Sequence, residues 1–148
     1  MRNYLYVAFL LLTSCAAVPT YQTYDGAALP NDKIAFVKTE SERNNVILAG
    51  LDKRMYIVDV DGIRPPSKST TDVPYPESAT LLPGPHRLTL LWEHHGRMAI
   101  VKVDGRFEAG KSYVIRQQPD SKLLRVWIED ASSKASVGTS TANMGEQG

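Results

Sequence analysis

Apolar and polar residues alternate with a period of two over much of the middle of the chain. The alternation is clearest near residue 90, where Leu88, Leu90 and Trp92 fall on one face of an extended strand. Thr89 and Glu93 fall on the opposite face. No stretch keeps a helical period over a dozen residues. The chain is therefore predicted to be all-β, either a sandwich or a barrel.

Seven short segments are rich in Val, Ile, Tyr and Thr and are bounded by Gly, Pro or Asp, which is typical of strands separated by turns. The predicted strands are 33–39, 46–49, 55–60, 86–94, 97–103, 112–118 and 123–129. Between two of them, His94-His95-Gly96 predicts a tight hairpin turn in which Gly96 supplies a positive φ.

Two six-residue segments, 57–62 and 100–105, resemble each other. Each runs from Ile-Val into Asp-Gly, so each predicts a strand that stops at its Asp-Gly pair. A duplicated half-sandwich would explain the likeness, and so would the frequent use of Asp-Gly at strand ends. The sequence leaves both explanations open.

The first 14 residues have the layout of a secretory signal peptide. Arg2 gives a cationic start, an apolar run covers residues 4–12, and small residues follow. The run is about half of the roughly 20 residues that a membrane-spanning helix needs. A transmembrane anchor is therefore not expected.

Cys15 is the only cysteine of the chain and ends the sequence Leu12-Thr13-Ser14-Cys15. This sequence resembles the lipobox of bacterial prolipoproteins. The resemblance implies that Cys15 is acylated with fatty acid such as palmitate and becomes the N-terminus. Ala16, where an Asp would favour the inner membrane, implies the outer membrane on its periplasmic side, although an outward orientation stays open. The alternative is an ordinary cleavable signal followed by an incidental cysteine.

Both ends of the mature chain are predicted to be irregular. Residues 15–32 are expected to form the lipidated cysteine and a flexible tether, spanning roughly 20–25 Å as a coil. Residues 131–148 are mostly small and polar and are predicted to be disordered, because they bury too little apolar surface to offset their ordering entropy. The β domain is expected to occupy residues 33–130.

The segment 61–78 contains four prolines and almost no periodicity. Loops longer than about 12–15 residues are uncommon inside compact domains and are often functional or disordered. Val73 and Tyr75 are therefore candidate partner-binding residues. A mobile surface crossover is the alternative interpretation.

Charge and residue types exclude several functions. The chain has 17 basic and 16 acidic residues, which argues against nucleic-acid binding. His86 and His94 lie eight residues apart in one predicted strand, about 26 Å, which is too far for one metal site. No motif for nucleophilic hydrolysis lies in a suitable context. We therefore predict no catalytic residue, no metal and no cofactor.

The last predicted strand places a tryptophan on the outside. Leu124, Val126 and Ile128 share the face expected to be the core, and Trp127 falls on the other face beside Arg125. An exposed Trp flanked by charges is a suitable anchor for a protein partner or a sugar ring. The alternative is that the tether or the proline-rich segment covers Trp127.

Two turn motifs carry a family resemblance. The segment 81–90, Leu-Leu-Pro-Gly-Pro-His-Arg-Leu-Thr-Leu, resembles the Leu-Pro-Gly-x-His hairpin of small outer-membrane lipoproteins of Gram-negative bacteria whose function is unknown. The segment 108–113, Glu-Ala-Gly-Lys-Ser-Tyr, resembles the turn that follows in them. The likeness covers residues 33–129 and is shared with PEGA-type and other immunoglobulin-like domains. It implies one immunoglobulin-like β-sandwich of about seven strands, and it carries over no catalytic residues.

The two motifs also have a structural explanation. Pro83 and Pro85 fix φ around Gly84, and Gly110 makes a turn after which Tyr113 is expected to bury its ring and bond a backbone group through its hydroxyl. The expected function is that of a lipid-anchored periplasmic protein, not an enzyme, that binds or supports a protein or glycan of the cell envelope. A structural or stress-related envelope component and an envelope hydrolase with an unrecognised site are the alternatives.

Overall fold

The alternating segments form the strands of a two-layered β structure. The computed structural model describes residues 20–42, 52–65 and 75–146. The described strands are β1 Thr20–Gln22, β2 Ala35–Thr39, β3 Arg54–Val60, β4 Ser78–Leu81, β5 Gly84–His94, β6 Arg97–Phe107, β7 Ser112–Asp120, β8 Leu123–Asp130, β9 Ser136–Asn143 and β10 Gly145–Glu146, with a 3-10 turn η1 Asn31–Lys33. The all-β prediction is confirmed. The described chain has ten strands, where about seven were expected.

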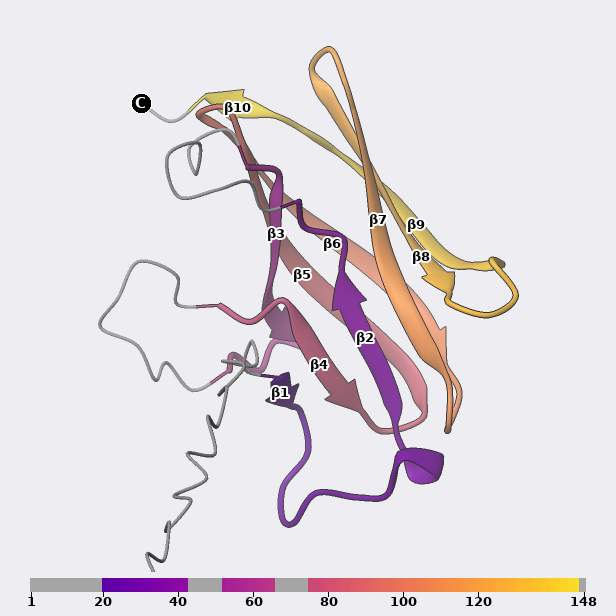
Figure 1. Cartoon of the computed structure of the whole chain (residues 1–148). Helices are drawn as coiled ribbons and strands as arrows, with labels where there is room; N and C mark the ends of the chain where they lie inside the picture. Colours follow the sequence, from indigo (N-terminus) through magenta and orange to yellow (C-terminus); the bar gives the residue numbers. More distant parts are fainter. Residues whose placement is uncertain (1–19, 43–51, 66–74, 147–148) are drawn as a thin grey trace, which may run out of the picture.

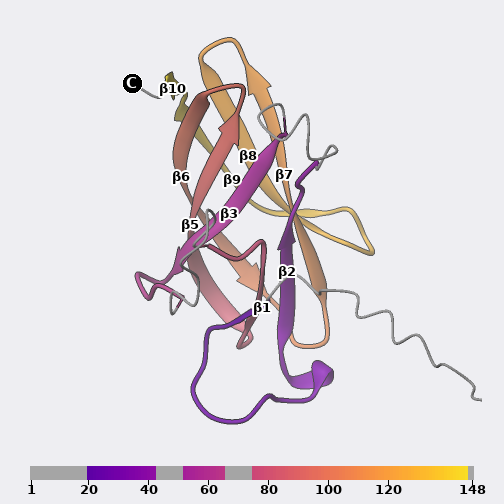
Figure 2. The same ribbon diagram turned by 60° about the vertical axis from the view of Figure 1, so that its left-hand side comes forward.

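Two sheets make up the layers. One has six strands in the order β1-β4-β2-β7-β8-β9, and the other has four in the order β10-β6-β5-β3. Figure 1 and Figure 2 show them from two directions, with β5 and β6 as a long hairpin in one layer and β7 and β8 in the other. The neighbours β1 and β4 are parallel, as are β2 and β7, and the other ladders are antiparallel. The fold is an all-β sandwich.

The core lies between the two layers, where the period-two pattern placed it. Leu88, Leu90 and Trp92 of β5 are completely buried, as are Leu124 and Ile128 of β8. The predicted inward faces of these two strands are therefore confirmed. Since a strand's side chains alternate between faces, Arg125 and Trp127 of β8 point out of the sandwich.

The last two strands join the layers along one side. β9 pairs with β8 in the six-stranded sheet, and β10 then pairs with β6 in the four-stranded sheet through Gly145 and Met98. Further down, Gly138 of β9 lies against Asp104 and Gly105 of β6. β9 therefore runs antiparallel beside β6 and closes this side of the sandwich (Figure 1).

The predicted disordered tail at residues 131–148 is wrong for its described part. Seven of the eight residues of β9 pair with β8, from Leu123↔Asn143 to Glu129↔Ser136, with a register shift at Val137. Val137, Ala142 and Met144 pack against the core. Small residues suffice here because β8 supplies the backbone partners of β9 and the core supplies the apolar surface.

The predicted tether at residues 15–32 also needs correction. β1 begins at Thr20, pairs with β4 and buries Tyr21 in the core. The described residues 23–34 continue as a loop that is held in part by hydrogen bonds from Gln22 Nε2 to the carbonyl groups of Tyr24 and Gly26. The chain is thus tied to the domain from residue 20.

The turn predictions have different outcomes. His95 (φ 51°) and Gly96 (φ 70°) make the predicted tight turn between β5 and β6, and Asp61 and Gly62 also have positive φ at the end of β3. The strand end predicted at residues 104–105 is wrong, because β6 continues to Phe107 and its ladder with β5 remains intact. The predicted strand 46–49 lies outside the described residues.

Candidate functional site

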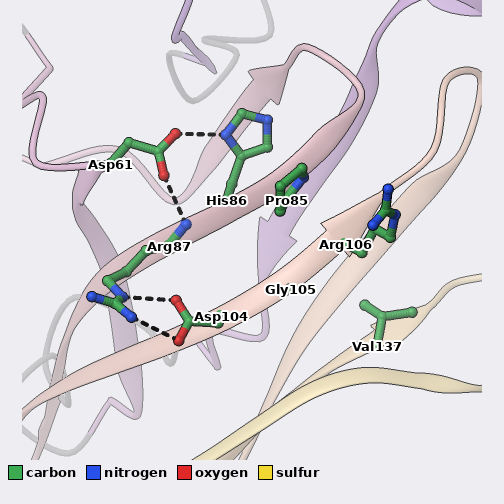
Figure 3. Close-up of a pocket in the computed structure, with 8 residues that line it drawn as sticks. All are labelled: Asp61, Pro85, His86, Arg87, Asp104, Gly105, Arg106 and Val137. Atoms are coloured by element: carbon green, nitrogen blue, oxygen red, sulfur yellow. Dashed lines mark hydrogen bonds and ion pairs between the residues drawn. The ribbon is translucent and has the colours of Figure 1, made fainter.

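A shallow groove lies on the surface where β3 ends and the β5–β6 hairpin begins (Figure 3). Its lining residues are Asp61, Pro85, His86, Arg87, Asp104, Gly105, Arg106 and Val137. The ladder between β3 and β5 places Asp61, at the end of β3, beside the start of β5, which presents His86 and Arg87 to it. The groove therefore joins Asp61 to residues that lie 24 to 76 positions further along the chain.

Asp61 completes the β3–β5 ladder with its side chain. Its backbone N–H donates to the carbonyl oxygen of Arg87 at 2.8 Å, and its Oδ1 accepts from the Arg87 N–H at 2.8 Å. Its Oδ2 lies 2.6 Å from Nδ1 of His86. Burial alone would raise the pKa of Asp61, but these hydrogen bonds outweigh burial and lower the pKa below its ordinary value.

His86 has oxygen atoms on both sides of its ring. Nδ1 faces the Asp61 carboxylate, and Nε2 lies 2.8 Å from the carbonyl oxygen of Leu82. The ring also contacts Phe107, with centroids 5.9 Å apart. Both ring nitrogens are therefore engaged in contacts within the protein. Through these contacts His86 fastens the β4–β5 turn to the end of β3.

A charged pair forms the outer wall of the groove. Arg87 and Asp104 face each other across the β5–β6 ladder, with Nε–Oδ1 at 2.7 Å and the second contact, from a terminal guanidinium nitrogen to Oδ2, at 3.0 Å. The hydrogen bond from Arg87 lowers the pKa of Asp104. Both side chains are largely exposed, so the pair contributes little stability. It fixes the direction of both charges.

The second candidate surface is the outer face of β7, β8 and β9 around Trp127. Trp127 lies in register with Arg116 on one side and Thr139 on the other. The Arg125 guanidinium lies over the indole, 5.6 Å from the ring centroid. Trp127 is half-buried, and its ring is therefore held in place by neighbours of its own sheet.

Arg116 connects this surface to β2. One guanidinium nitrogen donates to Glu40 at 2.7 Å, and the other donates to Glu129 at 3.4 Å. The hydrogen bond to Glu40 is the main cause of a raised pKa at Arg116. The side chains of Arg116, Glu40 and Glu129 therefore form a hydrogen-bonded network beside Trp127.

The other predicted contact residues do not join this surface. Tyr75 is half-buried next to Pro76, whose carbonyl accepts from Ile57 of β3, whereas β8 is separated from β4 by β2 and β7. Of the two segments expected to cover Trp127, β1 lies at this far edge beside β4, and Asp61 lies beside β5 in the other sheet. Val73 and Cys15 lie outside the described residues.

Two sequence motifs that predict turns also supply the residues of the groove. Asp61 belongs to the Asp-Gly pair that ends one of the two similar segments, and His86 ends the Leu-Pro-Gly-x-His motif. The structure gives this motif a physical role, because its histidine bonds the carbonyl of the motif's own leucine, Leu82. The contact between Asp61 and His86 depends on strand register, which neither segment specifies alone.

Across the described residues, no three His, Cys, Asp or Glu side chains come close enough to hold a metal ion. The same part of the chain contains no helix with the length and apolar character needed to cross a membrane.

Comparisons with protein-family models, with curated proteins and with solved structures found no match.

Proposed function

We propose that the chain is a lipid-anchored protein of the bacterial cell envelope that binds an envelope partner through the face around Trp127 and catalyses no reaction. The location rests on the sequence Leu12-Thr13-Ser14-Cys15, which places the only cysteine behind a signal-like apolar run. The acyl chains on Cys15 would hold the protein on the periplasmic side of the outer membrane.

The observation that carries the binding role is the position of Trp127. Its indole lies on an outward face, half-buried, with the Arg125 guanidinium over the ring. Trp and Arg are the residue types that most often dominate binding energy at interfaces. A rigid sheet also loses little conformational entropy when a partner docks. The surface suits the flat side of a sugar ring or an extended protein segment of the envelope.

The groove supports a structural role better than a catalytic one. Hydrolysis through the Asp61–His86 pair would need a ring nitrogen that can take a proton from a nucleophile. The second nitrogen of His86 instead contacts the Leu82 carbonyl. The hydrolase alternative is therefore not favoured by the histidine–aspartate contact in the groove.

Lipidation is tested in cells by feeding an alkynyl fatty acid and comparing the wild type with Cys15→Ser. The wild type is expected to carry the label and the variant to lose it, since Cys15 is the only cysteine. Equal labelling of both proteins would contradict the anchor.

Binding is tested by photo-crosslinking in cells from position 139, the exposed neighbour of Trp127 on β9. A crosslinker at Lys102, which is exposed on the opposite sheet, is the matched control. We expect a discrete product from position 139 that weakens at least fivefold when Trp127→Ala is added, and none from position 102. The same product from both positions, or no dependence on Trp127, would reject this surface.

A further inference from the structure

The connection between Cys15 and the folded domain is short. β1 starts at Thr20, which is held by the register with Ser78 and by a 3.0 Å contact between the two hydroxyl oxygens. Residues 16–19 alone separate Cys15 from Thr20. Five Cα–Cα steps of at most about 3.6 Å allow a reach of roughly 18 Å. An acylated Cys15 would therefore keep the membrane surface within about that distance of Thr20.

The position of Thr20 in the sheet determines which surface is near the membrane. Thr20 lies in one row with Ser78, Lys38 and Val114, two residues above the start of β7. The β4–β5 turn begins at Leu82, four residues along β4 from Ser78, and is thus roughly 13 Å from this row. Leu123 lies at the opposite end of the sandwich. It is four strands across the sheet from Thr20 and six residues further along the strand direction, which together give a distance of roughly 28 Å.

Three of the five large hydrophobic side chains that the described residues leave exposed lie on connections around β1. Ile63 is 62% exposed, Leu82 is 43% exposed and Leu29 is 39% exposed. The carbonyl of Ile63 accepts a hydrogen bond from the hydroxyl of Tyr21 at 3.4 Å, Leu82 directly follows β4, and Leu29 lies in the loop from β1 to β2. We call these three residues the apolar corner. The loop from β1 to β2 and the β4–β5 turn, which carry two of them, lie at the lower end of the ribbon in Figure 1.

Two of these three side chains stand on fixed backbone. The carbonyl of Leu82 is bound by His86, and His86 also contacts Asp61, which is two residues before Ile63. The Leu29 N–H donates to the hydroxyl of Tyr24 at 3.2 Å. Apolar side chains held at the tips of ordered connections can enter the headgroup and acyl boundary of a bilayer without a further ordering cost.

We propose that the apolar corner rests on the bilayer that holds acylated Cys15, so that the sandwich stands on the membrane with Leu29, Ile63 and Leu82 at the lipid surface. This inference depends on the proposed lipid anchor. The charged side chains nearby, Asp25, Asp32, Lys33 and Arg64, are exposed and of both signs. The contact is therefore apolar and should depend little on the fraction of anionic lipid.

The test uses the processed, acylated protein, purified from bacterial membranes and incorporated into vesicles of phosphatidylethanolamine and phosphatidylglycerol. Leu82→Cys and Ile63→Cys each introduce a single thiol that reacts with an environment-sensitive dye, because the sulfur of Cys15 carries lipid. Leu123→Cys is the matched control, since Leu123 is 51% exposed and lies at the far end. Lipids with a spin label near the headgroup then quench dyes at the membrane surface.

We expect quenching at positions 82 and 63 to exceed that at position 123 at least threefold, with little change when the phosphatidylglycerol fraction is varied. Vesicle flotation and the mass of the N-terminal peptide are measured on the same samples. A protein that floats and is acylated but is quenched equally at all three positions overturns the membrane contact alone. A protein that neither floats nor carries lipid overturns the anchor, and with it this inference.

Discussion

Gly138 of β9 lies directly over the carbonyl group of Asp104 in β6, at a place where no side chain fits. A Cβ atom built on Gly138 would overlap the Asp104 carbonyl oxygen and come within 3.1 Å of its carbon. This close approach is one point at which the C-terminal part of the chain meets the four-stranded sheet. A second point is in β10, where Gly145 pairs with Met98 of β6. The two points together close one side of the sandwich.

Gly138→Ala is therefore expected to destabilise the domain. The atom that meets the new methyl group belongs to backbone, so relief requires that β9 or β6 move, and overpacking of this kind costs about 1–3 kcal/mol or more. Gly145→Ala is the control, because a Cβ there has nothing within 4 Å. Urea unfolding should show a lower free energy of unfolding for Gly138→Ala and a change within about 0.5 kcal/mol for Gly145→Ala. Equal effects of the two would contradict the close approach.

The closure also predicts the effect of truncation. A chain that stops after Lys134 lacks β9 and β10, which leaves the edge of β8 unpaired and removes Val137, Ala142 and Met144 from the core. Such an edge promotes aggregation. We expect this protein to be largely insoluble or to lose cooperative thermal unfolding.

A chain that stops after Glu146 is the matched comparison. It keeps every described strand, so its melting temperature is expected to equal that of the full chain. A soluble protein that ends at Lys134 and melts like the full chain would show that β9 is dispensable. Circular dichroism during heating measures both variants.

The central strands of the sandwich could be predicted from the sequence, whereas β9 and the groove could not. The central strands were predictable because Leu88, Leu90 and Trp92 alternate with polar residues and one face must be buried. β9 has few large apolar residues, and its order comes from the neighbouring β8 and β6, which composition does not record. The same holds for the groove, where register alone joins Asp61 to His86. The outward direction of Trp127 was predictable from period two, but its contact with Arg125 was not.

Tyr113→Phe tests the turn between β6 and β7. The buried Tyr113 hydroxyl accepts the backbone N–H of Glu108 at 3.0 Å, and its ring packs against Phe107 with centroids 5.0 Å apart. The substitution keeps the ring and leaves a backbone donor without this partner, so we expect a loss of about 0.5–1.5 kcal/mol in the free energy of unfolding. Tyr24→Phe removes a similar bond in an exposed loop and should cost less. A larger cost for Tyr24→Phe would contradict this ranking.

The turn after β8 predicts a dependence of stability on pH. The Asp130 carboxylate accepts hydrogen bonds from the Ser132 hydroxyl at 2.6 Å and from the N–H groups of Ser133 and Ser132, each at 2.9 Å. These bonds, with the Ser132 hydroxyl first, lower the pKa of Asp130 well below its ordinary value. A lowered pKa means that the carboxylate stabilises the folded state above the ordinary pKa of an aspartate. This stabilisation is lost as the pH falls towards the lower, folded-state pKa.

Asp130→Asn is accordingly expected to lower the melting temperature at pH 7. The difference from the wild type should shrink once the pH drops below about 4, the ordinary value for aspartate. Differential scanning calorimetry between pH 2.5 and 7 measures both proteins. A difference that stays constant over this range would mean that the charge of Asp130 has no part in holding the turn.

His86→Ala tests whether the histidine fastens the end of the sandwich that we place at the membrane. The substitution removes the contacts to Asp61 and Leu82 and the ring contact to Phe107, so a cost of about 1 kcal/mol or more is expected. Hydrogen exchange should become faster in residues 61–64 and 82–87, which the histidine holds together. The turn between β7 and β8, at the far end, should not change.

Arg106→Ala is the matched control for that experiment. Arg106 is an exposed neighbour in the same groove, and its removal should leave the exchange rates of both segments unchanged. If His86→Ala exchanges like the wild type, the turn is held by its prolines and backbone ladder rather than by the histidine. If exchange in residues 61–64 and 82–87 becomes faster, the histidine of the Leu-Pro-Gly-x-His motif holds the β4–β5 turn against the end of β3. The same variant should then show weaker quenching at position 82 on vesicles, because a loosened turn no longer holds Leu82 at the lipid surface.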